Sequence, residues 1–316
     1  MKFGNSKLNK MQKWMLRNAR PLELARWRYI MELGRKEEVL VCLKAFQNFD
    51  GGFGHGIEPD FWNPGSSPMA SWAGAQVLLE VEARPEDEIV QNLVKYLVST
   101  VDLSTGMWPS SVPENNHYPH APWWQWKEGV QANWMFNPAV ELTACLIYWS
   151  KKSDEAWEIG WGSMEKAIRH LMKAEEMDRH ELNNYKNAME LLHSNTAEFN
   201  HRISYSFDTV EKKVWKLIED CMDRNYDNWG RDYQPLPLDF IDHPKQMKNI
   251  QFSEIESLVK KNLTFYATSL NDEGVWDITW NWEQYPEEFA VAKRIWQGIL
   301  IVNRCKILKE FDVINK

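Results

Sequence analysis

The sequence predicts an all-α protein built from helical hairpins. Apolar residues recur at three- and four-residue spacing along most of the 316 residues, which is the periodicity of amphipathic helices. Alternating β-branched residues, which would indicate strands, are nearly absent. A Gly-x-aromatic turn also recurs between the predicted helices, as expected for a chain of repeated supersecondary units.

Ten or eleven helices are predicted, and proline and glycine mark several of their ends. Pro21 favours a helix start, and Gly34 favours the end of that helix. Ser66 and Ser67 provide a cap ahead of the helix that starts at Pro68. The predicted ranges are 21–33, 36–46, 68–82, 86–101, 138–150, 154–174, 179–194, 207–225, 253–270 and 286–311.

The repeated turn has three clear copies and one degenerate copy. The clear copies end in Phe53, Trp108 and Trp276, and the degenerate one contains Trp229 and Gly230. The spacing is 55 residues from Phe53 to Trp108 and 47 from Trp229 to Trp276, while the 121 residues between Trp108 and Trp229 are about two repeats. Each repeat is long enough for one helical hairpin with its loops. Because no linker interrupts the pattern, we expect a single domain over residues 1–316.

Charge and composition exclude some partners. The net charge of −8 argues against a nucleic-acid ligand, because phosphate binding requires a basic surface. Residues 1–20 are locally basic and form a predicted N-terminal helix or arm, in which Leu8, Met11, Trp14 and Met15 can share one face. That face fits either packing on the rest of the fold or weak peripheral contact of residues 2–20 with a membrane.

The sequence contains no apolar run of the ~20 residues that a transmembrane helix needs. It also lacks the apolar core of a signal peptide. Its four cysteines are widely spaced, with no Cys-x-x-Cys pair, which is typical of buried reduced thiols. We therefore expect a cytoplasmic protein.

The first turn carries a resemblance to a known superfamily. Gln47, Gly51 and Phe53 have the spacing of the Gln/Trp-type repeat of the terpenoid cyclases and protein prenyltransferases, which that segment resembles. The copies at Gly106/Trp108 and Gly274/Trp276 match only its Gly-x-Trp half. The resemblance implies an α/α toroid, a barrel in which inner and outer helices alternate around a central cavity.

The catalytic motifs of that superfamily are missing. The chain contains neither the Asp-x-Asp-Asp motif of the class II cyclases nor the Asp-Asp-x-x-Asp motif of the isoprenyl diphosphate enzymes. No cysteine lies in the loops where the protein prenyltransferases hold zinc. The resemblance therefore predicts the fold, whereas the chemistry has to be inferred from the loops.

In a toroid, the loops that follow the Gly-x-aromatic turns would converge at one mouth. These loops, at 55–60, 115–126, 231–243 and 277–283, are rich in acids, histidines and tryptophans. Carboxylates that share an aromatic pocket have their pKa values driven apart, which separates a general acid from a general base. The catalytic candidates are Glu58, Asp60, Asp277, His55 and His120. The alternative for the acids is capping of nearby helices.

The same loops contain the predicted substrate-binding residues. Tryptophans can stack on sugar rings or shield a carbocation through their π-faces, and the alternative, packing between hairpins, is expected for at least two of them. The set is His117, Trp123, Trp124, Trp126, Trp280, Trp282 and Asp239. No metal site or other cofactor is predicted, because Pro119 disrupts the pair His117 and His120 and no third ligand is evident; a divalent metal there is the alternative.

Three functions follow from these features. The first is a terpenoid-cyclase-like or prenyltransferase-like enzyme that acts on an isoprenoid-like or other bulky small-molecule substrate. The second is a carbohydrate-active hydrolase or lyase on the same fold. The third is a non-catalytic binding toroid. An apolar closed chamber would favour the first, an open cleft with paired carboxylates the second, and the lack of any perturbed carboxylate the third.

Glu58 gives the sharpest prediction from the sequence. It lies in a turn rich in glycine and proline, directly after the best motif match. If it is the general acid, Glu58→Gln should lower activity by about 10²-fold or more and leave the fold intact, as measured by steady-state kinetics and circular dichroism. If it pins the loop instead, the same variant should lose stability and retain its activity.

Overall fold

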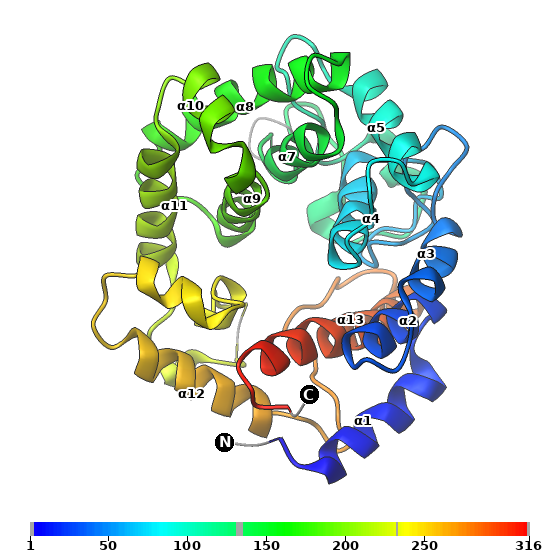
Figure 1. The fold of residues 1–316 in the computed structure, drawn as a ribbon. Coiled ribbons are helices and arrows are strands. Elements are labelled where there is room, and N and C mark those ends of the chain that lie inside the picture. The colour runs from blue at the N-terminus through cyan, green and yellow to red at the C-terminus, as the bar shows by residue number, and fades with distance from the viewer. Residues whose placement is uncertain (1–2, 131–134, 232, 315–316) are drawn as a thin grey trace. The chain divides into compact units, whose positions relative to one another are not determined.

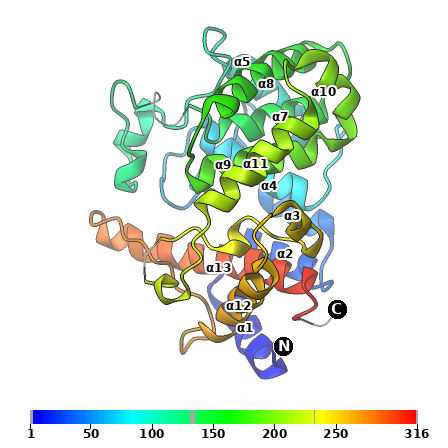
Figure 2. The same ribbon diagram turned by 90° about the vertical axis from the view of Figure 1, so that its left-hand side faces the viewer.

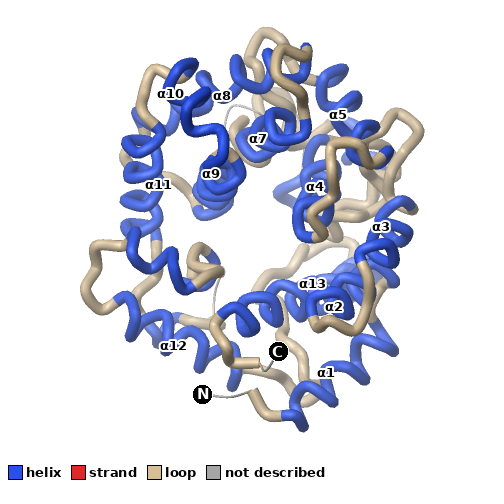
Figure 3. Tube along the Cα trace, viewed as in Figure 1, coloured by secondary structure: helices blue, strands red, loops and turns tan. Residues whose placement is uncertain are grey.

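The computed structural model describes residues 3–130, 135–231 and 233–314, and it confirms the all-α prediction. Within these ranges all regular structure is helical (Figures 1 and 3). The extended segments form only isolated bridges, such as the one between Phe61 and His120. None of the helices in these ranges is both long and apolar enough to cross a bilayer.

The described chain forms two compact units. Unit 1 combines residues 1–45 with 222–316, and unit 2 is the continuous segment 46–221. Unit 1 is therefore assembled from both ends of the chain. The predicted single domain and its closure into a toroid stay predictions.

Unit 1 is organised around its longest helix, α13. Helix α13 packs against α1 and α2, and α2 packs in turn against α3. Proline at the first position favours the starts of both α2 and α13. The helices of this unit are α1 (Asn5–Asn18), α2 (Pro21–Ile30), α3 (Lys36–Lys44), α12 (Ile255–Thr268) and α13 (Pro286–Glu310), with the short 3₁₀ helices η4 (Tyr226–Asn228), η5 (Pro237–Asp239) and η6 (Pro244–Asn249).

Helix α1 packs as an ordinary outer helix of unit 1. Met11, Trp14 and Met15 are fully buried, and Trp14 donates a hydrogen bond to Glu273 over 2.9 Å. Three of the four apolar residues of the predicted face are thus inside the protein, while Leu8 is partly exposed. This burial matches the packing alternative, and weak peripheral membrane contact through residues 2–20 stays a prediction.

Unit 2 is built around helix α7, which contacts α4, α5, α8 and α9. Almost every residue of α7 is buried, because these neighbours cover it from several sides. Figure 2 shows α9 and α11 side by side in this unit, where they also contact each other. Its helices are α4 (Pro68–Glu80), α5 (Glu88–Thr100), α7 (Ala139–Trp149), α8 (Glu155–Lys173), α9 (Arg179–Leu191), α10 (Thr196–Arg202) and α11 (Phe207–Cys221), with the 3₁₀ helices η1 (Pro113–His117), η2 (Pro122–Trp124) and η3 (His193–Asn195).

The first Gly-x-aromatic turn fastens the start of unit 2. The Gln47 side chain donates hydrogen bonds of 2.9 Å to the carbonyls of Gly51 and Ile89, which joins its own turn to α5. Phe53 is fully buried against Gly74, where any Cβ would lie 2.7 Å from the aromatic ring. These residues are structural, as expected for a hairpin staple.

The tryptophans of two later turns serve the same purpose. Trp108 donates to the Leu97 carbonyl over 3.0 Å, and Trp276 donates to the Tyr266 carbonyl over 2.9 Å. Both rings are 1% exposed. Each indole therefore donates to a carbonyl in the last turn of the preceding helix and ties the following turn to that helix. Trp108 and Trp276 are thus buried structural residues, as Phe53 is.

Two glycines of α8 provide a matched test of the contact between α7 and α8. A Cβ at Gly160 would lie 2.6 Å from the Ile147 side chain of α7, whereas a Cβ at Gly162 meets nothing within 4 Å. We expect Gly160→Ala to lower the free energy of unfolding by about 1–3 kcal/mol through overpacking. Gly162→Ala should raise it by about 0.5–1 kcal/mol, because alanine is the better helix former. Urea denaturation measures both, and equal effects would contradict the close contact at Gly160.

Candidate functional site

The loops that follow the first two Gly-x-aromatic turns converge in unit 2. The Trp62 amide donates to the Pro119 carbonyl over 2.9 Å, and the Ala121 amide donates to the Asp60 carbonyl over 2.7 Å. The sequence therefore correctly predicted that these two loops meet. The other two loops belong to unit 1, so a mouth shared by Glu58 and Asp277 stays a prediction.

Glu58 and Asp60 lie together in this loop contact and are both buried. The Glu58 carboxylate accepts a hydrogen bond of 2.7 Å from the Asp60 amide, two residues further along the chain. This is the arrangement in which the carboxylate pins its own loop. The geometry thus matches the structural alternative for Glu58, and its catalytic role stays a prediction.

The predicted histidines are not arranged for metal binding. Both ring nitrogens of His120 are in hydrogen bonds, with the Tyr118 carbonyl at 2.6 Å and with Gln125 at 2.8 Å. The exposed His55 contacts Asn48 over 2.8 Å. The residues that the structure describes contain no group of three potential ligands, so the divalent-metal alternative gains no support.

Of the five tryptophans predicted to bind substrate, two are packed inside the protein and three are partly exposed. Trp124 packs edge-on against Phe61 with ring centroids 5.6 Å apart, and Trp282 is fully buried beside Phe289. Packing is therefore the role of two of the five tryptophans, as expected. Trp123, Trp126 and Trp280 are partly exposed, and His117 is exposed at the end of η1.

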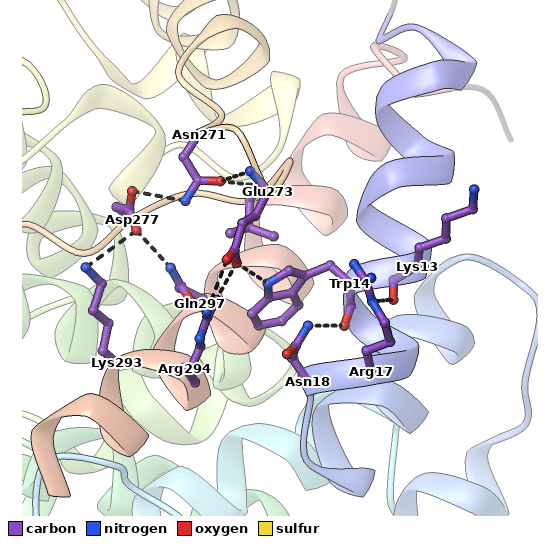
Figure 4. Close-up of polar contacts among 11 residues, drawn as sticks. Lys13, Trp14, Arg17, Asn18, Asn271, Glu273, Asp277, Lys293, Arg294 and Gln297 are labelled. Carbon is purple, nitrogen blue, oxygen red and sulfur yellow. Dashed lines mark hydrogen bonds and ion pairs between the residues drawn. The ribbon is translucent and has the colours of Figure 1, made fainter. Parts of the chain in front are cut away.

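Asp277 and Asp239 lie in unit 1 and have ordinary local roles. Asp239 accepts a hydrogen bond of 2.9 Å from the Leu236 amide, which caps the short helix η5. Asp277 is exposed and accepts from Gln297 over 2.8 Å and from Asn271 over 3.0 Å (Figure 4). Lys293 lies 3.7 Å from the same carboxylate. Asp277 thus joins the loop before α13 to that helix.

A second carboxylate strengthens this attachment. Glu273 accepts hydrogen bonds from Trp14 and from Arg294, which joins α1 to α13 (Figure 4). Hydrogen bonding to Arg294, and then to Trp14, lowers the pKa of Glu273 to about 2. The open depression over these groups, about 450 Å³ in volume, is lined by both charge signs. A carboxyl with so low a pKa is unsuited to proton transfer near neutral pH.

Unit 2 contains an acid–base pair that the sequence did not reveal. His170 near the end of α8 and Glu181 in the first turn of α9 are joined by a 2.9 Å contact between Nε2 and Oε1. The His170 ring stacks on Phe136 with centroids 4.0 Å apart. The Glu181 side chain is 13% exposed and that of His170 is 42% exposed, so the imidazole is accessible from solvent.

Burial shifts the pKa values of both members of this pair. Burial and then the charge of Asp178 raise the pKa of Glu181 to about 7. Burial and then Lys173 lower the pKa of His170. Both shifts favour the uncharged forms, in which a protonated carboxyl and a neutral imidazole share one hydrogen bond. The pair can therefore exchange a proton in the range where general acids and bases work best.

A second missed group is a carboxyl inside the same unit. Glu141 of α7 is 1% exposed and accepts hydrogen bonds from Trp72 and Gln76 of α4 and from Asn187 of α9. The Trp72 contact is 2.9 Å, and Asn187 lies 3.3 Å from both oxygens. Burial raises the pKa of Glu141, while these donors and the nearby Lys186 partly oppose the shift. We call Trp72, Gln76, Glu141, Lys186 and Asn187 the inner polar cluster.

One signal in the sequence pointed to Glu141. It is the only charged residue within the apolar run 139–147, where an acid is unexpected unless it is paired. His170 and Glu181 carried no such signal, because each lies among other polar residues and they are brought together by the packing of the two helices.

Comparison with known proteins does not assign the chain to a family or a function. No family model, no curated protein and no solved structure matches the chain. The function therefore has to be inferred from the residues themselves.

The raised pKa of Glu181 predicts how stability depends on pH. Between its ordinary pKa of 4.5 and its folded pKa of about 7, the folded protein holds a proton that the unfolded chain has released. The folded state therefore loses stability as the pH rises through this window. Relative to Glu181→Gln, the native protein should lose about 2 kcal/mol of unfolding free energy between pH 4.5 and 7.5, after allowance for partial solvent screening.

Urea denaturation across this pH range measures the effect. Glu176→Gln is the matched control, because Glu176 is an exposed carboxylate in the loop between the same two helices. Parallel stability curves for the native protein and Glu181→Gln would show that Glu181 has an ordinary pKa.

Proposed function

We propose that the protein is an enzyme of the hydrolase or lyase type, which uses His170 and Glu181 for general acid–base catalysis on a carbohydrate-like substrate. The observation that supports this proposal best is the 2.9 Å contact between the accessible imidazole and a mostly buried carboxyl. Perturbed carboxyls cluster at catalytic sites, so the raised pKa of Glu181 supports an enzyme over a purely binding protein.

The pair can supply an acid and a base. When Glu181 holds the proton and donates it to Nε2, the outer Nδ1 of His170 carries a hydrogen that can protonate a leaving oxygen. When the carboxylate accepts from Nε2–H, Nδ1 has a free lone pair that can remove a proton from water or from a substrate carbon. Both directions move one proton across the imidazole, between the carboxyl and the outer nitrogen.

The polar surroundings favour a carbohydrate over an isoprenoid. The side chains that α4 and α9 place around Glu141 are amides and an indole N–H, which suit hydroxyl groups better than hydrocarbon. The terpenoid-cyclase-like or prenyltransferase-like function stays a prediction from the turn motif. A diphosphate substrate would also need several unpaired cations, whereas Lys186 is hydrogen-bonded to Glu190 over 3.3 Å.

Activity screens on neutral oligosaccharides test the proposal, with release of reducing ends or of unsaturated products as readouts. We expect His170→Asn and Glu181→Gln each to lower kcat by about 10²-fold or more, since general acid–base catalysis contributes roughly 10²–10⁴-fold. His201→Asn is the matched control, because this exposed histidine on the neighbouring helix α10 lies outside the pair.

The pH profile separates catalysis from structural support. If the pair transfers protons, the slow Glu181→Gln enzyme should lose the ionisation near pH 7 from its profile of kcat against pH. Turnover that is unchanged in both variants would end the acid–base proposal. Release of diphosphate from prenyl diphosphates, with no activity on oligosaccharides, would favour the isoprenoid function.

A further inference from the structure

The side chains that donate hydrogen bonds to Glu141 are themselves partly exposed to solvent. Trp72, Gln76 and Asn187 each direct one N–H group at the carboxyl and keep part of their surface exposed to solvent. The buried carboxyl therefore fixes the orientation of an indole and two amides at the surface of α4 and α9. Such a set offers an aromatic face together with donors and acceptors.

The charges of the cluster largely cancel. Lys186 is 3% exposed and lies near the Glu141 carboxyl, which its charge helps to stabilise. Its ammonium also contacts Asn187 Oδ1 and Glu190, each over 3.3 Å. A site with one buried acid and one buried base does not select a strongly charged ligand. The acid would repel an anionic ligand, and the base would repel a cationic one.

An independent feature lies one turn away on α9. Asn184 is 2% exposed, and its amide group donates to Asn137 over 3.1 Å and to the His180 carbonyl over 2.8 Å. Its carbonyl oxygen Oδ1 is buried, and no donor from the described residues reaches it. An unmatched buried acceptor destabilises the fold, so a hydroxyl donor at this position would be favourable.

Asn184 also connects the cluster to the acid–base pair. It lies three residues after Glu181 and three before Asn187, so the three side chains occupy successive turns of one helix. With a rise of about 1.5 Å per residue, Glu181 and Asn187 are separated by roughly 9 Å along the axis of α9. At about 100° per residue their side chains point roughly 120° apart around the helix, with Asn184 midway between them. A ligand that curves around α9 by this angle can contact both.

We propose that Trp72, Gln76, Asn184 and Asn187 form a binding site for a neutral oligosaccharide along α4 and α9, oriented by the buried Glu141. This inference rests on the proposed function, because it supplies the substrate class for the pair His170 and Glu181. The exposed part of Trp72 stacks on a sugar ring, the amides of Gln76 and Asn187 bind hydroxyl groups, and Asn184 Oδ1 accepts a hydrogen bond from one of them.

Isothermal titration calorimetry of the full chain tests the site with glucose-, mannose- and galactose-based tetrasaccharides. We expect at least one of them to bind. Trp72→Phe, which keeps an aromatic ring and removes the N–H group, should weaken that binding about tenfold, and Asn184→Leu should weaken it by a similar factor. The midpoints of urea denaturation identify any variant that is unfolded. If Asn184→Leu does not fold, the conservative variant Trp72→Phe still tests the site.

Two further measurements check the location of the site and the class of its ligand. Tyr205→Ala alters an exposed aromatic side chain between α10 and α11 and should leave tetrasaccharide binding unchanged. Loss of binding in Tyr205→Ala, with full binding in Asn184→Leu and Trp72→Phe, would overturn the placement on α4 and α9. Binding of spermidine or geranyl diphosphate, with no tetrasaccharide bound, would overturn the ligand class.

Failure of this inference differs from failure of the proposed function. His170→Asn should lower turnover by about 10²-fold or more and still bind the tetrasaccharide with the native affinity, because His170 lies outside the four binding residues. If an oligosaccharide binds to the four proposed residues but no variant of His170 or Glu181 affects turnover, the proposed acid–base catalysis is wrong and the binding site is supported. If the pair supports turnover while Trp72→Phe and Asn184→Leu bind substrate normally, only the site is wrong.

Discussion

The arrangement of unit 2 depends on the burial of Glu141 inside an otherwise apolar helix. A carboxyl that loses water must recover its hydrogen bonds from the protein, and here the donors come from α4 and α9. These hydrogen bonds fix the position of α7 along α4 and α9. Apolar packing alone is less directional and would fix it less well. The same constraint orients the polar side chains that we assign to ligand binding.

The pair His170 and Glu181 offsets the free-energy cost of burying a carboxylate in a different way. Here burial is incomplete, and the carboxyl lowers its desolvation penalty by holding a proton up to a pH of about 7. Glu141 has enough donors to be fixed in place, whereas Glu181 has few and can exchange its proton with the imidazole. Helix α9 therefore carries both a rigid group and a titrating one.

The carboxylates of the loops and of unit 1 have mainly structural surroundings. Glu58 accepts from a backbone amide of its own loop, Asp239 caps a short helix, and Glu273 is held by an arginine. These are the interactions that acids in loops most often make, since backbone amides and arginines are the nearest donors. The loops 55–60 and 115–126 do meet, but their richness in acids and aromatics did not separate supporting residues from reactive ones.

The sequence by itself determined the helices and the staples between them. The predicted ranges 68–82, 138–150 and 286–311 agree with the observed helices to within about two residues, because periodicity, prolines and caps act locally. The short helix α10 was missed, since seven residues carry too little periodicity. Only the tertiary structure decided which polar groups meet. Glu181 lies eleven residues from His170 and Glu141 lies 46 from Asn187, and their proton affinities depend on burial and on partners that helix packing supplies.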